Sequence, residues 1–340
     1  MKLGCCNLNR WEHPTADQSP AKRKREFFCL QSIFYGFFFF SSKLSSSCLV
    51  GLCITMERGV QRWIVDISGW DPSPQDFSFA LSVLPSVEQP SVTRFVQMED
   101  RKRALVSRLL QYALVNEVLA IPYDEIIIKR TLEGKPYLEC DDVCADFPNF
   151  NFNASHHGDY VAIASEPLCL VGVDVVSIVI PQKETVIEFI QNFSSYFSSF
   201  EWDSIVNAGT SDDILIEFYR YWCLKEAYVK AIGSGVAYGL DRVEFHHSCW
   251  TNISVNVEGK AMKEWRFWLL ELGKGHLVSI ARGHPRSATE SYMRTLKQAE
   301  FDEEEYNAAL HLPNVRFVSR TVEQLIPVSH KDRVHRTSIS

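Results

Sequence analysis

The chain has 340 residues, of which 46% are hydrophobic and 23% are charged, and its formal net charge is −7. These fractions are those of a globular protein with one large domain or two modest ones, and they exclude a collagen-like, coiled-coil or wholly disordered chain. Because 42 acidic residues outnumber 35 Lys and Arg, they also exclude a basic nucleic-acid-binding protein.

Residues 1–56 differ in composition from the rest of the chain. They contain seven basic but only three acidic residues, and the window 27–40 holds seven of the 22 Phe. Three interpretations remain open: an upstream extension from gene modelling or an alternative start at Met56, an organelle transit peptide, and a membrane anchor. We expect a disordered or targeting extension outside the core. The protein is then expected to be cytoplasmic, or mitochondrial or plastid if the extension is a transit peptide.

The next part of the chain, residues 57–168, combines one long helical pattern with several strand patterns. Alternating hydrophobicity predicts a strand at 61–68. Apolar residues at helical intervals predict a helix over about 94–120 that ends before Pro122. Further strands are predicted at 125–130, 137–139 and 160–165.

Residues 169–285 repeat this order of elements. The apolar run 170–176 (LVGVDVV) predicts a buried strand. The longest helix is predicted at 211–232, with Ser211 as its cap and Gly233 at its end. The other elements are predicted helices at about 184–192 and 200–207, and predicted strands at 241–247, 251–257, 264–271 and 276–282.

Two similar halves, each with one long helix and several strands, indicate an α+β protein. The predicted N-terminal lobe is 57–168 and the predicted C-terminal lobe is 169–285, with a junction near 166–172. Beyond Pro285 the hydrophobic periodicity fades, so 286–340 is predicted to be a loosely ordered tail.

Asp174 stands in the otherwise apolar strand pattern 170–176. A buried carboxylate without a partner is costly. This side chain should therefore face a cation, a group of hydrogen-bond donors or a cleft. It either caps a loop at the end of the strand or binds a metal ion.

Glu226 and Lys230 are four residues apart in the helix 211–232, so they share one face of it. They form either a surface ion pair or, with Asp174, a site that holds Mg²⁺ and a diphosphate. Two carboxylates are enough for Mg²⁺, because this ion takes oxygen ligands and keeps several waters. Trp222 on the same stripe indicates that this face is partly covered.

The segment 151–158 (NFNASHHG) contains two adjacent His. They point different ways in most backbones and are a poor metal pair. One His beside Ser155 and Asn153 could instead bind a phosphate.

Four separated motifs follow one another at characteristic intervals: 134–136 (GKP), 152–158 (FNASHHG), 172–174 (GVD) and 222–231 (WCLKEAYVKA). With these motifs, the sequence over about 60–285 resembles the 4′-phosphopantetheinyl transferases of the Sfp type. Within that family it is most similar to the eukaryotic branch of aminoadipate-semialdehyde dehydrogenase phosphopantetheinyl transferase-like proteins.

The resemblance implies two pseudo-symmetric α+β lobes, each a long helix packed on a small, mostly antiparallel sheet, with coenzyme A in the cleft between them. It implies a Mg²⁺-dependent holo-[carrier-protein] synthase. This enzyme transfers the 4′-phosphopantetheine arm of coenzyme A to a Ser of an apo acyl, peptidyl or aminoadipate carrier protein, in fatty acid synthesis or lysine metabolism, and releases adenosine 3′,5′-bisphosphate. We expect a monomer whose catalytic body binds neither membrane nor nucleic acid. The alternatives are a non-catalytic paralogue that binds coenzyme A or a carrier protein, and a Mg²⁺-dependent diphosphate hydrolase.

The resemblance also assigns individual residues. Glu226 and Lys230 are the expected catalytic residues, and Asp174 and Glu226 are the expected Mg²⁺ ligands. The expected coenzyme A contacts are Arg130, Gly134, Lys135, Asn153, Ser155, His156, Asp174 and Lys230. The sequence departs from the family at two places. Val176 stands where many bacterial members have a second acid, and Ser91 stands where a basic residue is expected, with Arg94 as the nearest substitute.

Overall fold

The structure is a computed structural model that describes residues 58–139, 147, 149–235, 238–297 and 302–327. The extension predicted at 1–56 lies outside the described residues, as does the end of the predicted tail, 328–340. In the described residues no helix is both long enough and apolar enough to cross a membrane.

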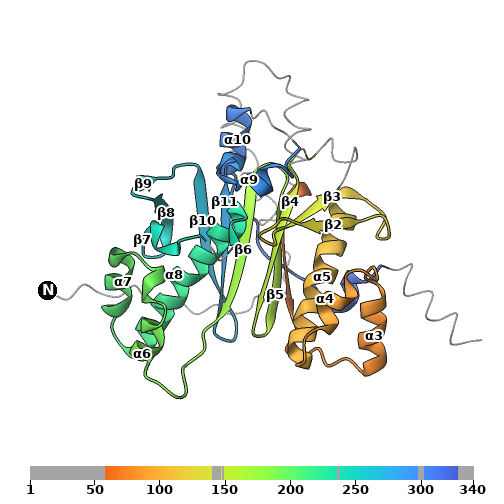
Figure 1. Ribbon diagram of the computed structural model, residues 1–340, viewed down its shortest axis with the longest axis horizontal. Helices are drawn as coiled ribbons and strands as arrows, with labels where there is room; N and C mark the ends of the chain where they lie inside the picture. The colour runs from red at the N-terminus through yellow and green to blue at the C-terminus, as the bar shows by residue number, and fades with distance from the viewer. Residues whose placement is uncertain (1–57, 140–146, 148, 236–237, 298–301, 328–340) are drawn as a thin grey trace, which may run out of the picture. The chain divides into compact units, whose positions relative to one another are not determined.

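The N-terminal lobe packs one long helix, α5 (Met98–Leu119), on a four-stranded sheet (Figure 1). The strand order is β12-β1-β5-β4, in which β5 is antiparallel to both β1 and β4, and β12 is parallel to β1. The sheet strands are β1 (Gln61–Asp66), β4 (Asn151–His157), β5 (Tyr160–Glu166) and β12 (Val318–Ser319). The remaining elements are α3 (Pro74–Ser82), α4 (Gln89–Thr93) and the hairpin of β2 (Ile127–Arg130) and β3 (Pro136–Glu139).

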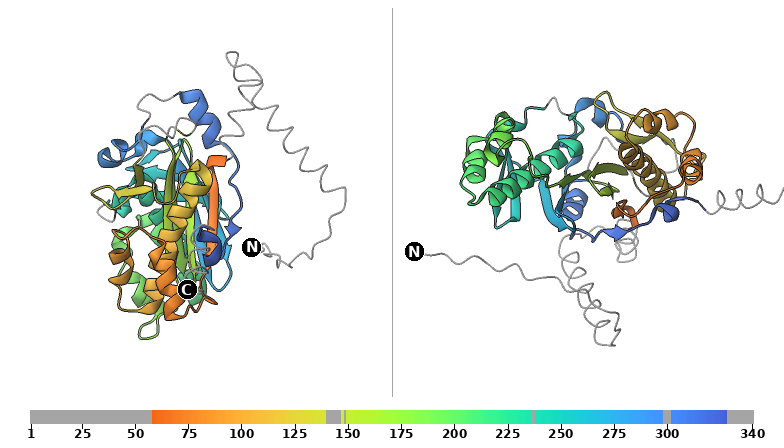
Figure 2. Two further views of the ribbon diagram at one scale, coloured as in Figure 1. Left: turned by 90° about the vertical axis from the view of Figure 1, so that its right-hand side faces the viewer. Right: turned by 90° about the horizontal axis from the view of Figure 1, so that it is seen from below.

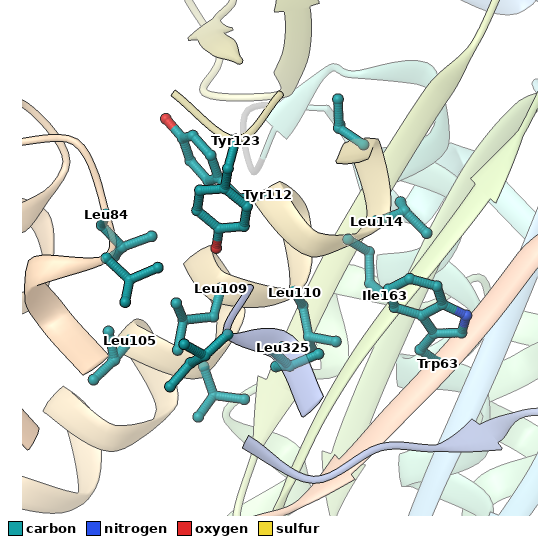
Figure 3. Close-up of a cluster of buried hydrophobic side chains, with 14 of the residues drawn as sticks. Trp63, Leu84, Leu105, Leu109, Leu110, Tyr112, Leu114, Tyr123, Ile163 and Leu325 are labelled. Atoms are coloured by element: carbon teal, nitrogen blue, oxygen red, sulfur yellow. The ribbon is translucent and has the colours of Figure 1, made fainter. Parts of the chain in front are cut away.

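The apolar face of α5 forms the centre of this lobe. Leu105, Leu109 and Leu110 are fully buried at helical spacing. Figure 3 shows Leu105 on the side of Leu84, and Leu110 beside Leu325 on the side of Trp63 of β1. The helix ends at Ala120, which takes the left-handed conformation (φ 57°) just before Pro122. The predicted helix is therefore confirmed, although it begins four residues later than expected.

The C-terminal lobe packs its own long helix, α8 (Ser211–Ile232), on a three-stranded antiparallel sheet of order β10-β11-β6. Its strands are β6 (Leu170–Ser177), β10 (Trp265–Leu272) and β11 (His276–Gly283). The other elements are the helices α6 (Val186–Gln191) and α7 (Ser199–Val206) and the small sheet of β7 (Val243–Ser248), β8 (Thr251–Val257) and β9 (Lys260–Ala261). Each lobe thus pairs a long helix with a mostly antiparallel sheet, which confirms the predicted α+β fold of two similar lobes.

The bounds of α8 agree with the prediction, but its N-cap residue differs. Thr210 is the N-cap, not Ser211: its hydroxyl accepts a hydrogen bond from the backbone N–H of Asp213, and the Asp213 carboxylate accepts the N–H of Thr210. This reciprocal capping box satisfies two otherwise unpaired donors. Gly233 ends the helix with φ 77°, as predicted.

A ladder of side chains joins the two lobes. Every second residue of β4 accepts a hydrogen bond from a backbone N–H of β6, at distances of 3.0–3.1 Å. The rungs of this side-chain ladder pair Asn151 with Val171, Asn153 with Val173, Ser155 with Val175, and His157 with Ser177. The ladder satisfies the edge of β6 that faces away from β11, so the two sheets meet without backbone-to-backbone pairing.

A buried ionic cluster supports the same junction. Glu166 at the end of β5 accepts hydrogen bonds from Arg62 of β1 and from Arg282 of β11, the latter at 2.9 Å. All three side chains are almost completely buried. A buried carboxylate held by two guanidinium groups ties the sheets of both lobes to one point.

The segment after β11 is more ordered than predicted. We expected a loosely ordered tail over 286–340, but α9 (Glu290–Met293), α10 (Glu303–Leu310) and β12 belong to it. Tyr306 and Leu310 of α10 are buried against Leu168, and Arg282 donates to the carbonyl of Leu312 at 2.6 Å. Figure 2 (left) shows this blue segment beside the orange strand β1. Contacts with both lobes, rather than its own periodicity, order the segment.

The ladder makes a direct prediction about stability. Asn153→Ala removes the acceptor of the Val173 N–H and leaves a buried donor without a partner, which costs about 1–3 kcal/mol. Urea unfolding should therefore show a lower midpoint. The control is Asn307→Ala on the exposed face of α10, where a change within about 0.5 kcal/mol is expected. Equal midpoints for the two variants would contradict a stabilising role of the rung.

Candidate functional site

The site begins with an unusually close approach of β6 to α8. A Cβ atom added at Gly172 would lie 1.9 Å from the carbonyl oxygen of Ala227 and 2.6 Å from the amide nitrogen of Ala231. Only glycine allows this approach. The glycine of the GVD motif therefore sets the spacing between the strand that carries Asp174 and the helix that carries Glu226 and Lys230.

Asp174 projects from β6 toward the N-terminal lobe and toward Lys230. Its side chain is almost fully buried, and its Oδ1 accepts hydrogen bonds from Ser155 Oγ at 3.0 Å and from the ammonium of Lys230. Its other oxygen, Oδ2, is buried and has no hydrogen-bond partner among the described residues. A buried carboxylate oxygen that lacks a partner is costly, and it marks a place where a cation would be stabilised.

Ser155 connects the side-chain ladder with this charged group. Its hydroxyl accepts the N–H of Val175, lies 3.1 Å from Lys230 Nζ, and donates to Asp174. One serine of the N-terminal lobe thus contacts two of the three predicted functional groups of the C-terminal lobe, Asp174 and Lys230.

The pKa values of Glu226 and Lys230 are both raised, but for different reasons. Burial and the nearby Asp174 raise the pKa of Glu226, while Lys230 opposes the change. For Lys230, burial opposes the charge, but Asp174 and Glu226 together raise the pKa above its usual value. The Glu226 carboxylate makes no hydrogen bond to any other residue in the described ranges. It remains available to a ligand, whereas Lys230 stays charged at neutral pH.

Lys225, the neighbour of Glu226, points away from the site. It is completely buried and pairs with Glu201 of α7 at 2.7 Å, and it also donates to the Leu240 carbonyl at 2.8 Å. This ion pair anchors α8 to the rest of its lobe and thereby fixes the direction in which Glu226 projects.

His156 lies on the other side of β4 from the ladder. Its ring reaches solvent, but the surrounding protein partly removes it from water, and the charges of Lys230 and Arg103 add to this effect, so its pKa falls to about 4. The ring is therefore neutral at physiological pH. It can offer a hydrogen bond to a ligand but not a positive charge.

Positive charge next to His156 comes from arginines. Arg108 of α5 pairs with Glu88 at 2.9 Å, and its pKa is lowered by burial and by Arg94. Burial, Arg108 and Arg94 together lower the pKa of Arg130 to about 10. Repulsion between the guanidinium groups of Arg108 and Arg130, with Arg94 adding to it, favours an anionic ligand at this place. The sequence assigns Arg130 and suggests Arg94. Arg108 belongs to a basic cluster at 101–108, for which the sequence leaves open a solvated helix face or a basic rim for a phosphate-bearing ligand.

The remaining predicted residues have structural partners. Arg130 donates to the Gly134 carbonyl at 3.0 Å, and Gly134 has φ 91°, as the tight turn between β2 and β3 requires. The side-chain oxygen of Asn153 accepts the N–H of Val173 in the side-chain ladder. The ammonium of Lys135 donates hydrogen bonds to backbone carbonyls of the C-terminal lobe. The structure therefore brings together Asp174, Glu226, Lys230 and Ser155, and it gives the polar groups of Asn153 and Lys135 other partners.

A Mg²⁺ site here would rest on few protein ligands. The described residues contain no group of three or more His, Cys, Asp or Glu that could hold a metal ion. The residues present nevertheless fit Mg²⁺, because Asp174 Oδ2 and the Glu226 carboxylate are both without hydrogen-bond partners in the described ranges. Two carboxylates suffice for an ion that usually keeps several waters.

The chain is thus a two-lobed α+β protein with an acidic and a basic group on facing elements, and comparisons with known proteins show which class of protein has this organisation. Residues 68–168 match the family described as 4′-phosphopantetheinyl transferase, N-terminal, and residues 170–281 match the 4′-phosphopantetheinyl transferase superfamily. The chain belongs to this superfamily, and the resemblance inferred from the four motifs is confirmed.

Three relatives show how similar the chain is to individual phosphopantetheinyl transferases. The chain is 34% identical over 242 residues to the L-aminoadipate-semialdehyde dehydrogenase-phosphopantetheinyl transferase of Rattus norvegicus. This alignment covers 69% of this chain and 78% of the rat protein. It is 33% identical over 241 residues to the protein of the same name from Homo sapiens, covering 68% and 78%. It is 34% identical over 231 residues to a phosphopantetheinyl transferase of Thraustochytrium, covering 66% and 79%.

The close approach at Gly172 predicts a severe effect of a single methyl group. Gly172→Ala should destabilise the fold by about 1–3 kcal/mol or more, because a backbone carbonyl cannot move aside as a flexible side chain can. Guanidinium unfolding measures this change. Gly69→Ala is the control, since nothing lies within 4 Å of the Cβ atom that it adds. A Gly172→Ala protein as stable as the control would overturn the packing argument.

The raised pKa of Glu226 predicts a pH-dependent stability. A carboxyl whose pKa is higher in the folded protein than in the unfolded chain stabilises the fold at low pH, and this contribution is lost as pH rises through the folded pKa. In metal-free buffer, the melting temperature of Glu226→Gln relative to the unmodified protein should therefore increase from below pH 4.5 to pH 7. Glu125→Gln, at an exposed position, should show a constant difference. A constant difference for Glu226→Gln as well would refute the prediction.

Proposed function

We propose that this protein transfers the 4′-phosphopantetheine arm of coenzyme A to a serine of an apo carrier protein and releases adenosine 3′,5′-bisphosphate. The observation that carries the proposal is the buried Oδ2 of Asp174, which has no hydrogen-bond partner in the described part of the chain and lies next to Lys230 and Glu226. In a chain of this superfamily, such a group suits a ligand that brings both a cation and a diphosphate.

Asp174 and Glu226 are the residues that would hold Mg²⁺. When bound, Mg²⁺ would neutralise negative charge on the diphosphate of coenzyme A, a large contribution to phosphoryl transfer. The single charge of Lys230 cannot balance two carboxylates and a diphosphate together. This imbalance of charge supports a Mg²⁺-dependent enzyme.

Lys230 would contact the diphosphate directly. Its ammonium is held between Asp174 Oδ1 and Ser155 Oγ, so it occupies one place before the substrate arrives. A preorganised cation costs no reorganisation when charge develops on the leaving group. That property supports a role of Lys230 in catalysis as well as in binding.

Glu226 is the proposed general base. The serine oxygen of the carrier attacks the phosphorus attached to the pantetheine arm, and the bond from that phosphorus to the bridging oxygen breaks. The serine proton passes to Glu226, directly or through a water. The raised pKa of this carboxylate suits a proton acceptor, although holding Mg²⁺ would lower its basicity.

The adenosine end of coenzyme A is proposed to lie against the N-terminal lobe. Arg130, Gly134, Ser155 and His156 are the expected contacts, and Asn153 holds β4, the strand of Ser155 and His156, against β6. Since His156 is neutral, we assign the charge that balances the phosphates of this end to Arg108 and Arg130. Arg94 is close enough to share this role.

Acyl, peptidyl and aminoadipate carrier proteins are the proposed acceptors. The rat and human relatives are named after an aminoadipate-semialdehyde dehydrogenase, which supports an acceptor of this kind. A comparison of kcat/KM for apo carriers of fatty acid synthesis and of lysine metabolism would rank these acceptors.

The transfer itself is tested by mass spectrometry. A purified apo carrier incubated with the protein, coenzyme A and Mg²⁺ should gain the mass of one phosphopantetheine group. EDTA should stop the reaction and excess Mg²⁺ should restore it. Asp174→Asn or Lys230→Met should lower kcat by about 10²–10³-fold, because each removes charge stabilisation that acts in the transition state.

Asp124→Asn is the matched control for this experiment, since Asp124 is exposed. Its rate should equal that of the unmodified protein. Binding of coenzyme A without any gain in carrier mass, across acyl, peptidyl and aminoadipate carriers, would reject the transferase proposal and favour a non-catalytic binding protein. Release of phosphate products without a carrier would favour a hydrolase.

A further inference from the structure

Lys135 occupies an unusual position for a charged side chain. It follows the turn between β2 and β3 of the N-terminal lobe, and its side chain enters the C-terminal lobe, where the residue is only 5% exposed. No carboxylate forms an ion pair with it within the described part of the chain. Burying a cation without a counter-ion is costly, so its surroundings require an explanation.

Three backbone carbonyls surround the ammonium of Lys135. Nζ donates to Val171 of β6 at 2.9 Å, to Lys230 of α8 at 2.7 Å, and to Ala231 of α8 at 3.3 Å. The two helix carbonyls belong to the last turn of α8, whose carbonyls have no partner within the helix and which carries the negative end of the helix dipole. The ring of Tyr292 covers the ammonium at 4.7 Å.

These contacts join the two elements that carry the site. Val171 lies three residues before Asp174 on β6, and Lys230 itself provides one of the carbonyls. The N–H of Val171 is bonded to Asn151 of the ladder, so both polar groups of that residue are held by the N-terminal lobe. Lys135 therefore fastens strand to helix beside the close contact at Gly172.

We propose that Lys135 is a positioning residue that holds the last turn of α8 against β6 and so fixes the separation of Lys230 and Glu226 from Asp174. This inference rests on the proposed function of those three residues. It assigns the ammonium of Lys135 to the geometry of the catalytic group and not to direct contact with coenzyme A.

The same arrangement links the nucleotide end of the site to the reacting end. Arg130 and Gly134 lie on the hairpin that carries Lys135, and Glu133 of this hairpin accepts a hydrogen bond from Ser291 at 2.5 Å. A ligand that orders the hairpin therefore also holds the end of α8. Misplacing a catalytic group by about 1 Å can cost about 10²-fold in rate, so a loose helix end would reduce turnover.

The decisive variant is Lys135→Met, which keeps the apolar stem but removes the three donors. We expect kcat for transfer to an apo carrier to fall by about tenfold or more, with KM for the carrier within about twofold of the unmodified value and with a higher Mg²⁺ concentration needed for half-maximal rate. The matched control is Lys129→Met on the same hairpin, where the lysine is exposed and pairs with Glu139. Its kinetics should not change.

Two further measurements separate positioning from general loss of structure. Lys135→Gln restores two donors and should recover part of the lost kcat. If the Met variant does not fold, the Gln variant alone must still show a reduced kcat. A kcat unchanged in a folded variant, or a rise confined to KM for coenzyme A, would overturn the inference.

Hydrogen exchange tests the inference without any activity. Amides in peptides covering 226–235 should exchange faster in Lys135→Met than in Lys129→Met, because the last turn of α8 loses its anchor. Equal exchange would overturn the inference even if the unmodified protein is an active transferase. If that protein modifies no carrier, the proposed function fails, and the exchange result still decides whether Lys135 holds the helix.

Discussion

The side-chain ladder between β4 and β6 is the interaction on which the rest of the structure depends. Two sheets from different lobes meet at strand edges, yet no backbone pairing joins them. Four side chains at alternate positions of β4 accept the N–H groups of β6 instead. Because the side-chain period of a strand is two, a slip of one residue would turn every rung to the opposite face. The ladder therefore fixes one register between the lobes.

This register decides what the site contains. Ser155 is a rung of the ladder and a partner of both Asp174 and Lys230, so the same hydroxyl serves the junction and the charged group. The alternate residue His156 faces the arginines of α5, where its ring is neutral. Gly172 then brings α8 close enough for Glu226 and Lys230 to lie beside Asp174. The close packing at Gly172 and the contacts of the Lys135 ammonium act together on these distances.

The sequence predicts most of the regular elements, because long apolar periods and helix ends are local features. It also predicts Asp174, Glu226 and Lys230, since their motifs recur in a known family. The sequence does not predict the strand β4, because its core-facing Phe152 is surrounded by polar residues. The side chains of these residues bind the N–H groups of β6, a contact that no local pattern reveals. Order in 302–327 was missed for a similar reason, since its buried residues pack on both lobes. The position of the Lys135 ammonium follows from tertiary contacts alone, and no local pattern indicates it.

The pairing of β12 with β1 has a consequence for biosynthesis. Trp63 pairs with Val318, so the edge of the first sheet is completed by one of the last described segments of the chain. The N-terminus of a nascent chain leaves the ribosome first, and domains begin to fold as they emerge. The first sheet therefore keeps an open strand edge until Val318, about 250 residues after β1, has been translated. An exposed edge is a site for wrong pairing, which makes the interval before β12 emerges a period in which this protein is exposed to aggregation.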